Sequence, residues 1–124
     1  PSFEVALDSN GELWTTNPGM HSLQRYNDKG DLLRSWDQIS IRVDGFSGCC
    51  NPAHIAILPD NSFVTSEKGM PRIKIHGANG DLISVVAPPA AFDGDHAPEV
   101  AAWGQDTVVA LDYDKKLLRI FAKK

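Results

Sequence analysis

The sequence predicts an all-β fold: a fragment of a β-propeller with about three four-stranded antiparallel blades. The main observation is a repeat, in which residues 3–36 align without a gap on residues 53–86 at an offset of fifty. At an offset of forty-five a third copy follows, with Val100-Ala101 on Ile55-Ala56. Repeats of this period are supersecondary units that bury their apolar faces only against one another. Four strands in each 45–50 residues is the length of a propeller blade.

Apolar residues in each copy alternate along short stretches, which is the pattern of half-buried strands. The positions that mark the first three strands of each copy are Val5/Leu7, Leu13/Thr15, Leu23/Arg25, Ile55/Ile57, Phe63/Thr65, Ile73/Ile75, Val100/Ala102, Val108/Ala110 and Leu118/Ile120. Residues 32–36 and 82–87 are the predicted fourth strands of the first two copies. The third copy stops after its third strand, so we expect the last blade to lack its fourth strand.

The turns between these strands agree with the strand prediction. Asn10-Gly11 lies between a first and a second strand, and residues 28–31 and 78–81 lie between third and fourth strands. Glycine and asparagine at these places adopt the positive φ that tight antiparallel connections require. The blade repeats are predicted at about residues 3–37, 53–87 and 98–121. Residues 38–52 and 88–97 are then the loops that connect one blade to the next.

The second copy resembles an NHL repeat. The resemblance rests on residues 53–56 and 59–65, on the Pro-Arg-Ile-Lys-Ile stretch at 71–75, and on Asn-Gly-Asp-Leu at 79–82. It extends over nearly the whole chain, although the first copy matches less well and the third lacks the glycines. The resemblance implies a six-bladed propeller. Such propellers serve as interaction platforms, as sensors and, more rarely, as metal-dependent lyases or esterase-like hydrolases.

Composition and charge disfavour two modes of action, binding to nucleic acid and insertion into a membrane. The chain has 124 residues and a formal net charge of −4, and its lysines and arginines are scattered rather than clustered. Binding to nucleic acid is disfavoured because it requires a basic face. Membrane insertion is also disfavoured, since no apolar run approaches the roughly 20 residues that span a bilayer. The chain begins at Pro1 rather than Met, which favours a mature, excised or truncated product. The compartment is left open by the sequence, with an extracytoplasmic (periplasmic or secreted) location favoured over others.

Polar loop residues are predicted to gather at one rim of the blades. In a propeller, the connections between blades and those between second and third strands emerge on the same side, where binding residues are common. His54 directly precedes an innermost strand, so we expect it at the mouth of the axial channel as a ligand or a general base. The alternatives are an ordinary loop hydrogen bond for the histidines and a solvated ion pair of Glu67 with Lys68. The ligand-rim candidates are His54, Glu67, His21, His96 and Asp95.

The neighbouring cysteines Cys49 and Cys50 leave three interpretations open. They pack as two small apolar side chains, or they form a vicinal disulfide, which requires an oxidising compartment. In the third interpretation, Cys50 and His54 ligate a transition metal, with the Cys-x-x-x-His spacing that suits a metal site.

The leading functional prediction is a non-catalytic propeller module that binds a protein, a peptide or a small molecule at its loop rim. No residue is assigned as catalytic from the sequence. The alternative is a metal-dependent enzyme of lyase or hydrolase type, or a metal site on the Cys/His rim, completed by other blades or a second copy. Three blades cannot close a ring and leave strand edges and apolar faces open. The expected partner is therefore a second copy of the chain or the missing half of the propeller.

Overall fold

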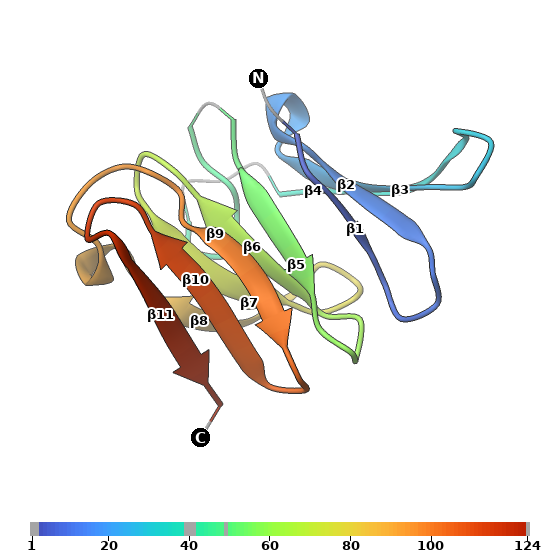
Figure 1. Cartoon of the computed structure of the whole chain (residues 1–124). Helices are drawn as coiled ribbons and strands as arrows, with labels where there is room; N and C mark the ends of the chain where they lie inside the picture. The colour runs from blue at the N-terminus through green and yellow to red at the C-terminus, as the bar shows by residue number, and fades with distance from the viewer. Residues whose placement is uncertain (1–2, 39–41, 49, 124) are drawn as a thin grey trace.

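The computed structural model describes residues 3–38, 42–48 and 50–123, and its chain folds into three successive antiparallel sheets (Figure 1). Blade 1 contains β1 (Val5–Leu7), β2 (Leu13–Asn17), β3 (Ser22–Tyr26) and β4 (Leu32–Asp37). Blade 2 contains β5 (His54–Ile57), β6 (Phe63–Glu67), β7 (Arg72–His76) and β8 (Leu82–Ala87). Blade 3 contains β9 (Glu99–Trp103), β10 (Thr107–Asp112) and β11 (Leu117–Ala122). The predicted all-β propeller fragment is therefore confirmed, and within the described residues the sheet of blade 3 has three strands, as expected.

Each blade is a meander in which every strand pairs with the next one along the chain. In the hairpin between the third and fourth strands of blade 1, a side chain accepts hydrogen bonds from backbone N–H groups of the turn. Asn27 Oδ1 accepts hydrogen bonds from the N–H groups of Lys29 and Asp31, both at 2.9 Å. The glycine of the equivalent turn in blade 2, Gly80, has a φ of +94°, and a Cβ there would lie 3.0 Å from the Trp36 ring. Only glycine combines this conformation with this close approach.

Within the described ranges, no helix is long and apolar enough to cross a membrane.

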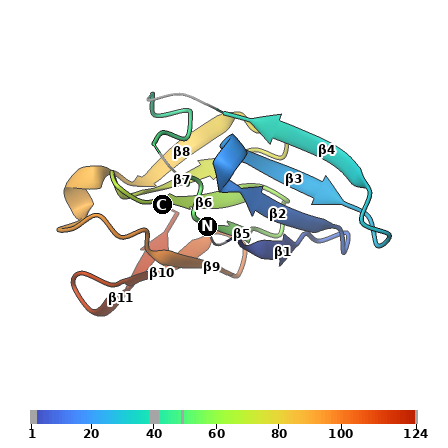
Figure 2. The same cartoon turned by 90° about the horizontal axis from the view of Figure 1, so that it is seen from above.

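Every blade has two faces, because side chains alternate along each strand. We call the side toward the preceding blade the front face and the opposite side the rear face. The strand registers assign Ile55, Thr65 and Lys74 to the front face of blade 2, and Val64 and Ile75 to its rear face. The blades stack with their first strands β1, β5 and β9 neighbouring one another (Figures 1 and 2).

The core lies between the blades rather than inside any one of them. Between blades 1 and 2, Trp14 and Leu23 from the rear face of blade 1 pack with Ile55 and Phe63 from the front face of blade 2. The rings of Trp14 and Phe63 meet edge to face, with centroids 4.6 Å apart. Between blades 2 and 3, a second cluster contains Val64 and Ile73 from blade 2 together with Val100, Val108 and Ala110 from blade 3. Each large apolar side chain that is buried in this way contributes about 1.5–3 kcal/mol.

A buried ion cluster lies within the front face of blade 2. Glu67 is 1% exposed, and its two carboxylate oxygens accept hydrogen bonds from Arg72 Nε at 2.6 Å and Arg72 Nη2 at 2.9 Å. Lys74 Nζ lies 3.0 Å from the same carboxylate. Buried charges are tolerated only when they are paired and hydrogen-bonded, so these three side chains depend on one another.

The cluster also fixes the loop that leads into blade 2. Lys74 Nζ donates to the carbonyl oxygens of Val43 at 2.8 Å and Gly45 at 2.6 Å. The ring of Phe46, from the same loop, lies 4.8 Å from Lys74 Nζ and is fully buried. A cation over an aromatic face is attracted by the quadrupole of the ring. The described part of this loop is thereby held on blade 2.

The same arrangement recurs in blade 3, and blade 1 has a neutral counterpart. In blade 3, Arg119 Nη1 lies 3.1 Å from Asp112 and donates at 2.7 Å to the carbonyl of Ala91, in the loop that leads into this blade. The Phe92 ring lies 5.2 Å from its guanidinium. In blade 1 the equivalent positions are Asn17 and Gln24, whose amides share a 3.3 Å hydrogen bond. We call this repeated acid–cation pair and its loop contacts the loop clamp.

The loop clamp predicts a specific pH dependence of stability. Burial lowers the pKa of Lys74 to about 8, whereas an unfolded lysine titrates near 10.4. Between these values the unfolded chain binds more protons, so the contribution of Lys74 to stability rises with pH and is lost as pH falls through 8. From pH 7.5 to pH 10, we expect the wild type to gain on the order of 1–3 kcal/mol relative to Lys74→Met. Urea denaturation of both proteins at the two pH values measures this difference. The exposed Lys29→Met is the matched control, and parallel behaviour of wild type and Lys74→Met would contradict the prediction.

Candidate functional site

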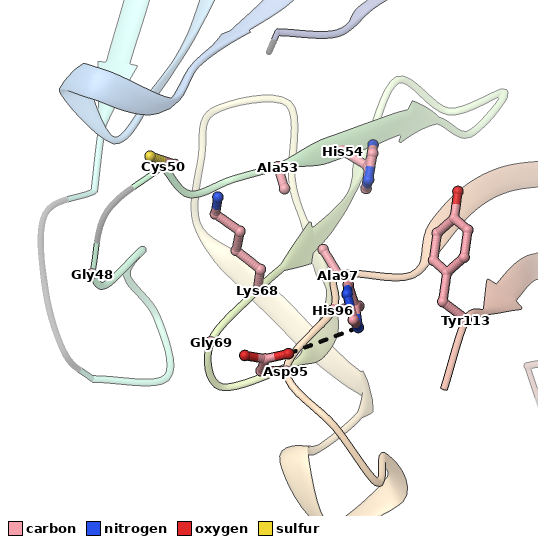
Figure 3. A pocket seen from close by; sticks show the side chains of 10 residues that line it. All are labelled: Gly48, Cys50, Ala53, His54, Lys68, Gly69, Asp95, His96, Ala97 and Tyr113. Atoms are coloured by element: carbon pink, nitrogen blue, oxygen red, sulfur yellow. Dashed lines mark ion pairs between the residues drawn. The ribbon is translucent and has the colours of Figure 1, made fainter. Parts of the chain in front are cut away.

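A cavity of about 580 Å³ opens at the rim where the inter-blade loops meet the turns between second and third strands (Figure 3). Residues from the loops that precede β5 and β9, and from the β6–β7 and β10–β11 turns, line it. Its polar lining residues are Cys50, His54, Lys68, Asp95, His96 and Tyr113. Elements from two neighbouring blades therefore form one concave surface.

Hydrogen bonds join the loops that form this cavity. Asn51 is 2% exposed, and its side chain accepts from the Lys68 N–H at 2.8 Å and donates to the Lys68 carbonyl at 3.0 Å. On the other side, the Gly69 N–H donates to the Asp95 carbonyl at 2.8 Å. The β6–β7 turn is thus attached to both inter-blade loops. Side chains that project from these segments have a fixed backbone, which binding sites require.

Three potential metal ligands converge beside the cavity. Glu4, His54 and Glu99 each offer one ligand atom, and these atoms all lie within 4.8 Å of one another. In the part of the chain that the structure describes, no other three acidic, histidine or cysteine side chains bring their ligand atoms this close together. Each comes from a different blade and stands at the same repeat position, since 4, 54 and 99 are separated by offsets of fifty and forty-five. All three side chains are partly exposed, with His54 the most buried.

The charges of this group favour a cation at its centre. His54 Nδ1 lies 2.5 Å from Glu4 Oε2 and 3.6 Å from Glu99 Oε1. The hydrogen bond to Glu4 raises the pKa of His54, against the opposing effect of burial, and the charges of both glutamates add to the increase. A site that stabilises a proton between two carboxylates also suits a metal ion. Two carboxylates and one imidazole, with further positions open to solvent, match the preferences of divalent cations such as Mn²⁺, Mg²⁺ or Zn²⁺.

A second histidine in the cavity is oriented by a carboxylate. His96 Nδ1 lies 2.9 Å from Asp114 Oδ1 and 3.7 Å from Asp95 Oδ1. The hydrogen bond to Asp114 raises the pKa of His96. The loop passes directly over Asp114 at Gly94, where a Cβ would lie 2.5 Å from the Asp114 carboxylate. A histidine held through Nδ1 by a carboxylate keeps Nε2 available to take up or release a proton.

The structure brings together only part of the predicted rim set. Of the five ligand-rim candidates, His54, Asp95 and His96 line the cavity. His21 is not among the lining residues, and its Nδ1 is buried. Glu67 forms no pair with Lys68. Its carboxylate is turned into blade 2, where Arg72 and Lys74 bind it, because a buried acid needs buried cations.

The interpretations of the cysteine pair stay predictions. Cys50 lines the cavity, whereas Cys49 lies outside the described residues. Cys50 is not part of the converging group around His54.

Sequence reasoning missed Glu4 and Glu99. Both look like ordinary polar residues at the start of a strand, and neither lies in a long loop. The signal that could have identified them is the repeat itself. Once His54 is suspected, the offsets of fifty and forty-five lead directly to residues 4 and 99.

No protein-family model matches the sequence, and no curated protein matches it either. Solved structures do match the fold. Virginiamycin B lyase from Staphylococcus aureus has a TM-score of 0.52 and 17% identity, over 97% of this chain and 40% of that chain. A streptogramin B lyase structure has a TM-score of 0.58 and 14% identity, with the same two coverages. A catalytically inactive S. aureus virginiamycin B lyase with quinupristin has a TM-score of 0.52 and 18% identity, over 95% of this chain and 40% of that chain.

These similarities concern the fold. The neighbours are β-propeller proteins, and this chain shares their blade arrangement at identities too low to carry a shared activity. The chain spans about 40% of the length of the solved structures it matches. Membership of the NHL family in particular stays a prediction.

Proposed function

We propose that this chain contributes a divalent-cation site, formed by Glu4, His54 and Glu99, to a propeller that binds a small ligand in the adjacent cavity. The proposal extends to metal-assisted elimination or hydrolysis of that ligand. The observation that supports it most directly is the convergence of three ligand atoms within 4.8 Å. One ligand comes from each blade at one repeat position, so the convergence follows from the stacking of the blades.

The chain's own residues suit such chemistry. A divalent cation bound there would supply a Lewis acid that polarises a carbonyl or a leaving oxygen. His96, oriented by Asp114, would remove or return a proton as general base and acid. Lys68 and Tyr113, which line the same cavity, would hold polar groups of the ligand. The hydrogen bonds from the β6–β7 turn to Asn51 of one inter-blade loop and to the Asp95 carbonyl of the other keep these side chains in place.

The solved structures support the enzymatic part only as an analogy of fold. All three are described as virginiamycin B or streptogramin B lyases, and one of them, a catalytically inactive form, is a structure with quinupristin. An elimination requires a base that removes a proton and a group that stabilises the resulting charge. His96 and the three-residue cation site are candidates for these two roles in this chain.

Manganese binding tests the cation site. We expect saturable binding of Mn²⁺, followed by electron paramagnetic resonance of the free ion, and competition by Mg²⁺. The double variant Glu4→Gln/Glu99→Gln removes two of the three ligands and should abolish binding. The matched control, Asp28→Asn/Asp106→Asn, removes two exposed carboxylates on turns away from the cavity and should bind like the wild type. Equal binding by both double variants would exclude the proposed site.

Turnover is tested separately. The Mn²⁺-loaded protein is incubated with quinupristin, and its conversion is followed by mass spectrometry with and without chelator. Metal-dependent conversion that is lost in His96→Ala supports the enzymatic part. Metal binding without conversion contradicts lyase activity toward this compound and leaves the predicted binding module.

A further inference from the structure

The rear face of blade 3 is exposed at positions that the other blades bury. Leu23 in blade 1 and Ile73 in blade 2 are both 0% exposed, because each is covered by the next blade. Leu118 stands at the same repeat position in blade 3 and is 61% exposed. The same face also exposes Trp103 by 63% and Ile120 by 58%. The rear face of blade 3 therefore carries the apolar residues of an inter-blade contact, but no described blade packs on it.

The front face of blade 1 shows the complementary pattern. Ile55 and Val100 are 2% and 8% exposed in the front faces of blades 2 and 3, but the equivalent Val5 is 52% exposed. Leu7 on the same strand is 65% exposed. Exposed apolar surface of this extent marks an interaction site on a folded protein.

None of the described residues covers these two faces. Blade 2 lies between blades 1 and 3, and the two exposed faces are at opposite ends of the arc (Figures 1 and 2). Each exposed face nevertheless matches one half of the two inter-blade contacts that the chain already forms. Inside the chain, a rear face always packs on a front face.

We infer that a second copy of this chain covers both faces, with the rear face of blade 3 of each copy on the front face of blade 1 of the other. The two identical contacts close a twofold ring of six blades, and they continue the contact that recurs within the chain. A closed cyclic dimer is the commonest way for one chain to satisfy its own exposed surface.

The charges of the two faces agree with this pairing. The strand registers give β1, β2 and β3 a front face of Val5, Leu7, Leu13, Thr15, Gln24 and Tyr26, which carries no charge. They give the rear face of blade 3 the residues Ala101, Trp103, Val109, Leu111, Leu118 and Ile120, also uncharged. Only Glu99, at the rim end, adds a charge to this rear face. Glu99 lies 3.6 Å from His54 Nδ1 of its own chain, so burial of these surfaces leaves no charge unpaired.

The loop clamp explains how the front face of blade 1 can pack on a second copy of the chain. Blades 2 and 3 instead pack on a blade that is joined to them by a connecting loop. In blades 2 and 3 the clamp cations need loop carbonyls, which Val43, Gly45 and Ala91 provide. In blade 1, Gln24 is neutral, and its Oε1 accepts hydrogen bonds within the blade from the Asn17 amide and the Tyr26 hydroxyl. A rear face can therefore pack on blade 1 without delivering a loop.

Closure would also complete the rim. In such a ring, each copy would contribute its converging Glu4, His54 and Glu99 at the inner strands of its blades. Two copies place six such side chains around one axis, so the ligand site would be shared between the chains.

The mass of the protein in solution tests the inference. In the presence of chelator, so that the result is independent of the proposed cation site, we expect twice the 13.5 kDa of one chain by analytical ultracentrifugation. Leu118→Glu and Leu7→Glu should each sediment as a monomer at the same concentration. Ile83→Glu is the matched control, since Ile83 is 62% exposed on the outer strand of blade 2, away from both end faces, and it should remain a dimer.

A mixing experiment separates loss of contact from loss of fold. Leu118→Glu keeps an intact front face and Leu7→Glu an intact rear face, so a mixture of the two should recover a dimer through one native contact. A monomeric wild type, a Leu118→Glu that remains dimeric, or a mixture that remains monomeric would each overturn the inference. Open-ended oligomers larger than a dimer would also overturn it, because they would mean that the ring does not close.

Discussion

Glu67→Gln is expected to destabilise the protein by about 3–5 kcal/mol, the cost of removing one partner from a buried ion cluster. The substitution preserves shape but leaves Arg72 and Lys74, which are 4% and 0% exposed, without the carboxylate that binds both of them. Those two cations also hold the carbonyls of the loop that leads into blade 2, so that loop should loosen with the cluster. The loss would approach half of the total stability of a typical domain.

Urea denaturation followed by tryptophan fluorescence measures this loss, since Trp14 and Trp36 lie in the core next to the cluster. Glu12→Gln is the control, because it makes the same chemical change at the partly exposed Glu12–Arg25 pair. Exposed pairs contribute about 0–1 kcal/mol, so this variant should unfold almost like the wild type. A Glu67→Gln protein as stable as Glu12→Gln would contradict the buried-cluster interpretation.

His54→Ala is expected to weaken Mn²⁺ binding by at least 100-fold. Changes to groups that only orient a metal ligand already cost about 10–100-fold in affinity, so the loss of the ligand itself should cost more. His54 is the central member of the group, with Nδ1 facing both Glu4 and Glu99. Removing it leaves two carboxylates on separate blades with no group between them.

The control for this prediction is His96→Ala. Both histidines line the same cavity, but His96 pairs with Asp95 and Asp114 and not with the cation group. Its removal should change Mn²⁺ affinity by no more than about twofold. Equal losses in the two variants would mean that the metal binds elsewhere in the cavity.

The fold could be predicted because the repeat is legible in the sequence. Apolar residues recur at offsets of fifty and forty-five, and turn residues separate them, so strands and blades follow with little tertiary information. The same reasoning fails where a residue's role depends on which blade covers it. Trp14 is buried between blades whereas Trp103 is 63% exposed, although both lie on β-strands.

The site was only partly predictable for a related reason. Loop position singled out His54 and His96, which line the cavity, because rims collect polar loops. It failed for Glu67, whose partners Arg72 and Lys74 lie across a turn on the same face of the blade. It also gave no weight to Glu4 and Glu99, which converge with His54 only after three separate sheets have stacked.

Because the three converging side chains belong to three separate sheets, a bound cation would act as a crosslink between blades that share no backbone hydrogen-bond ladder. Each blade could then separate from its neighbour only by also breaking a coordination bond. A ligand that binds the folded state alone adds its binding free energy to stability. A cation bound by these three residues would therefore oppose sliding of one blade past the next. Separation of the three blades would become more cooperative.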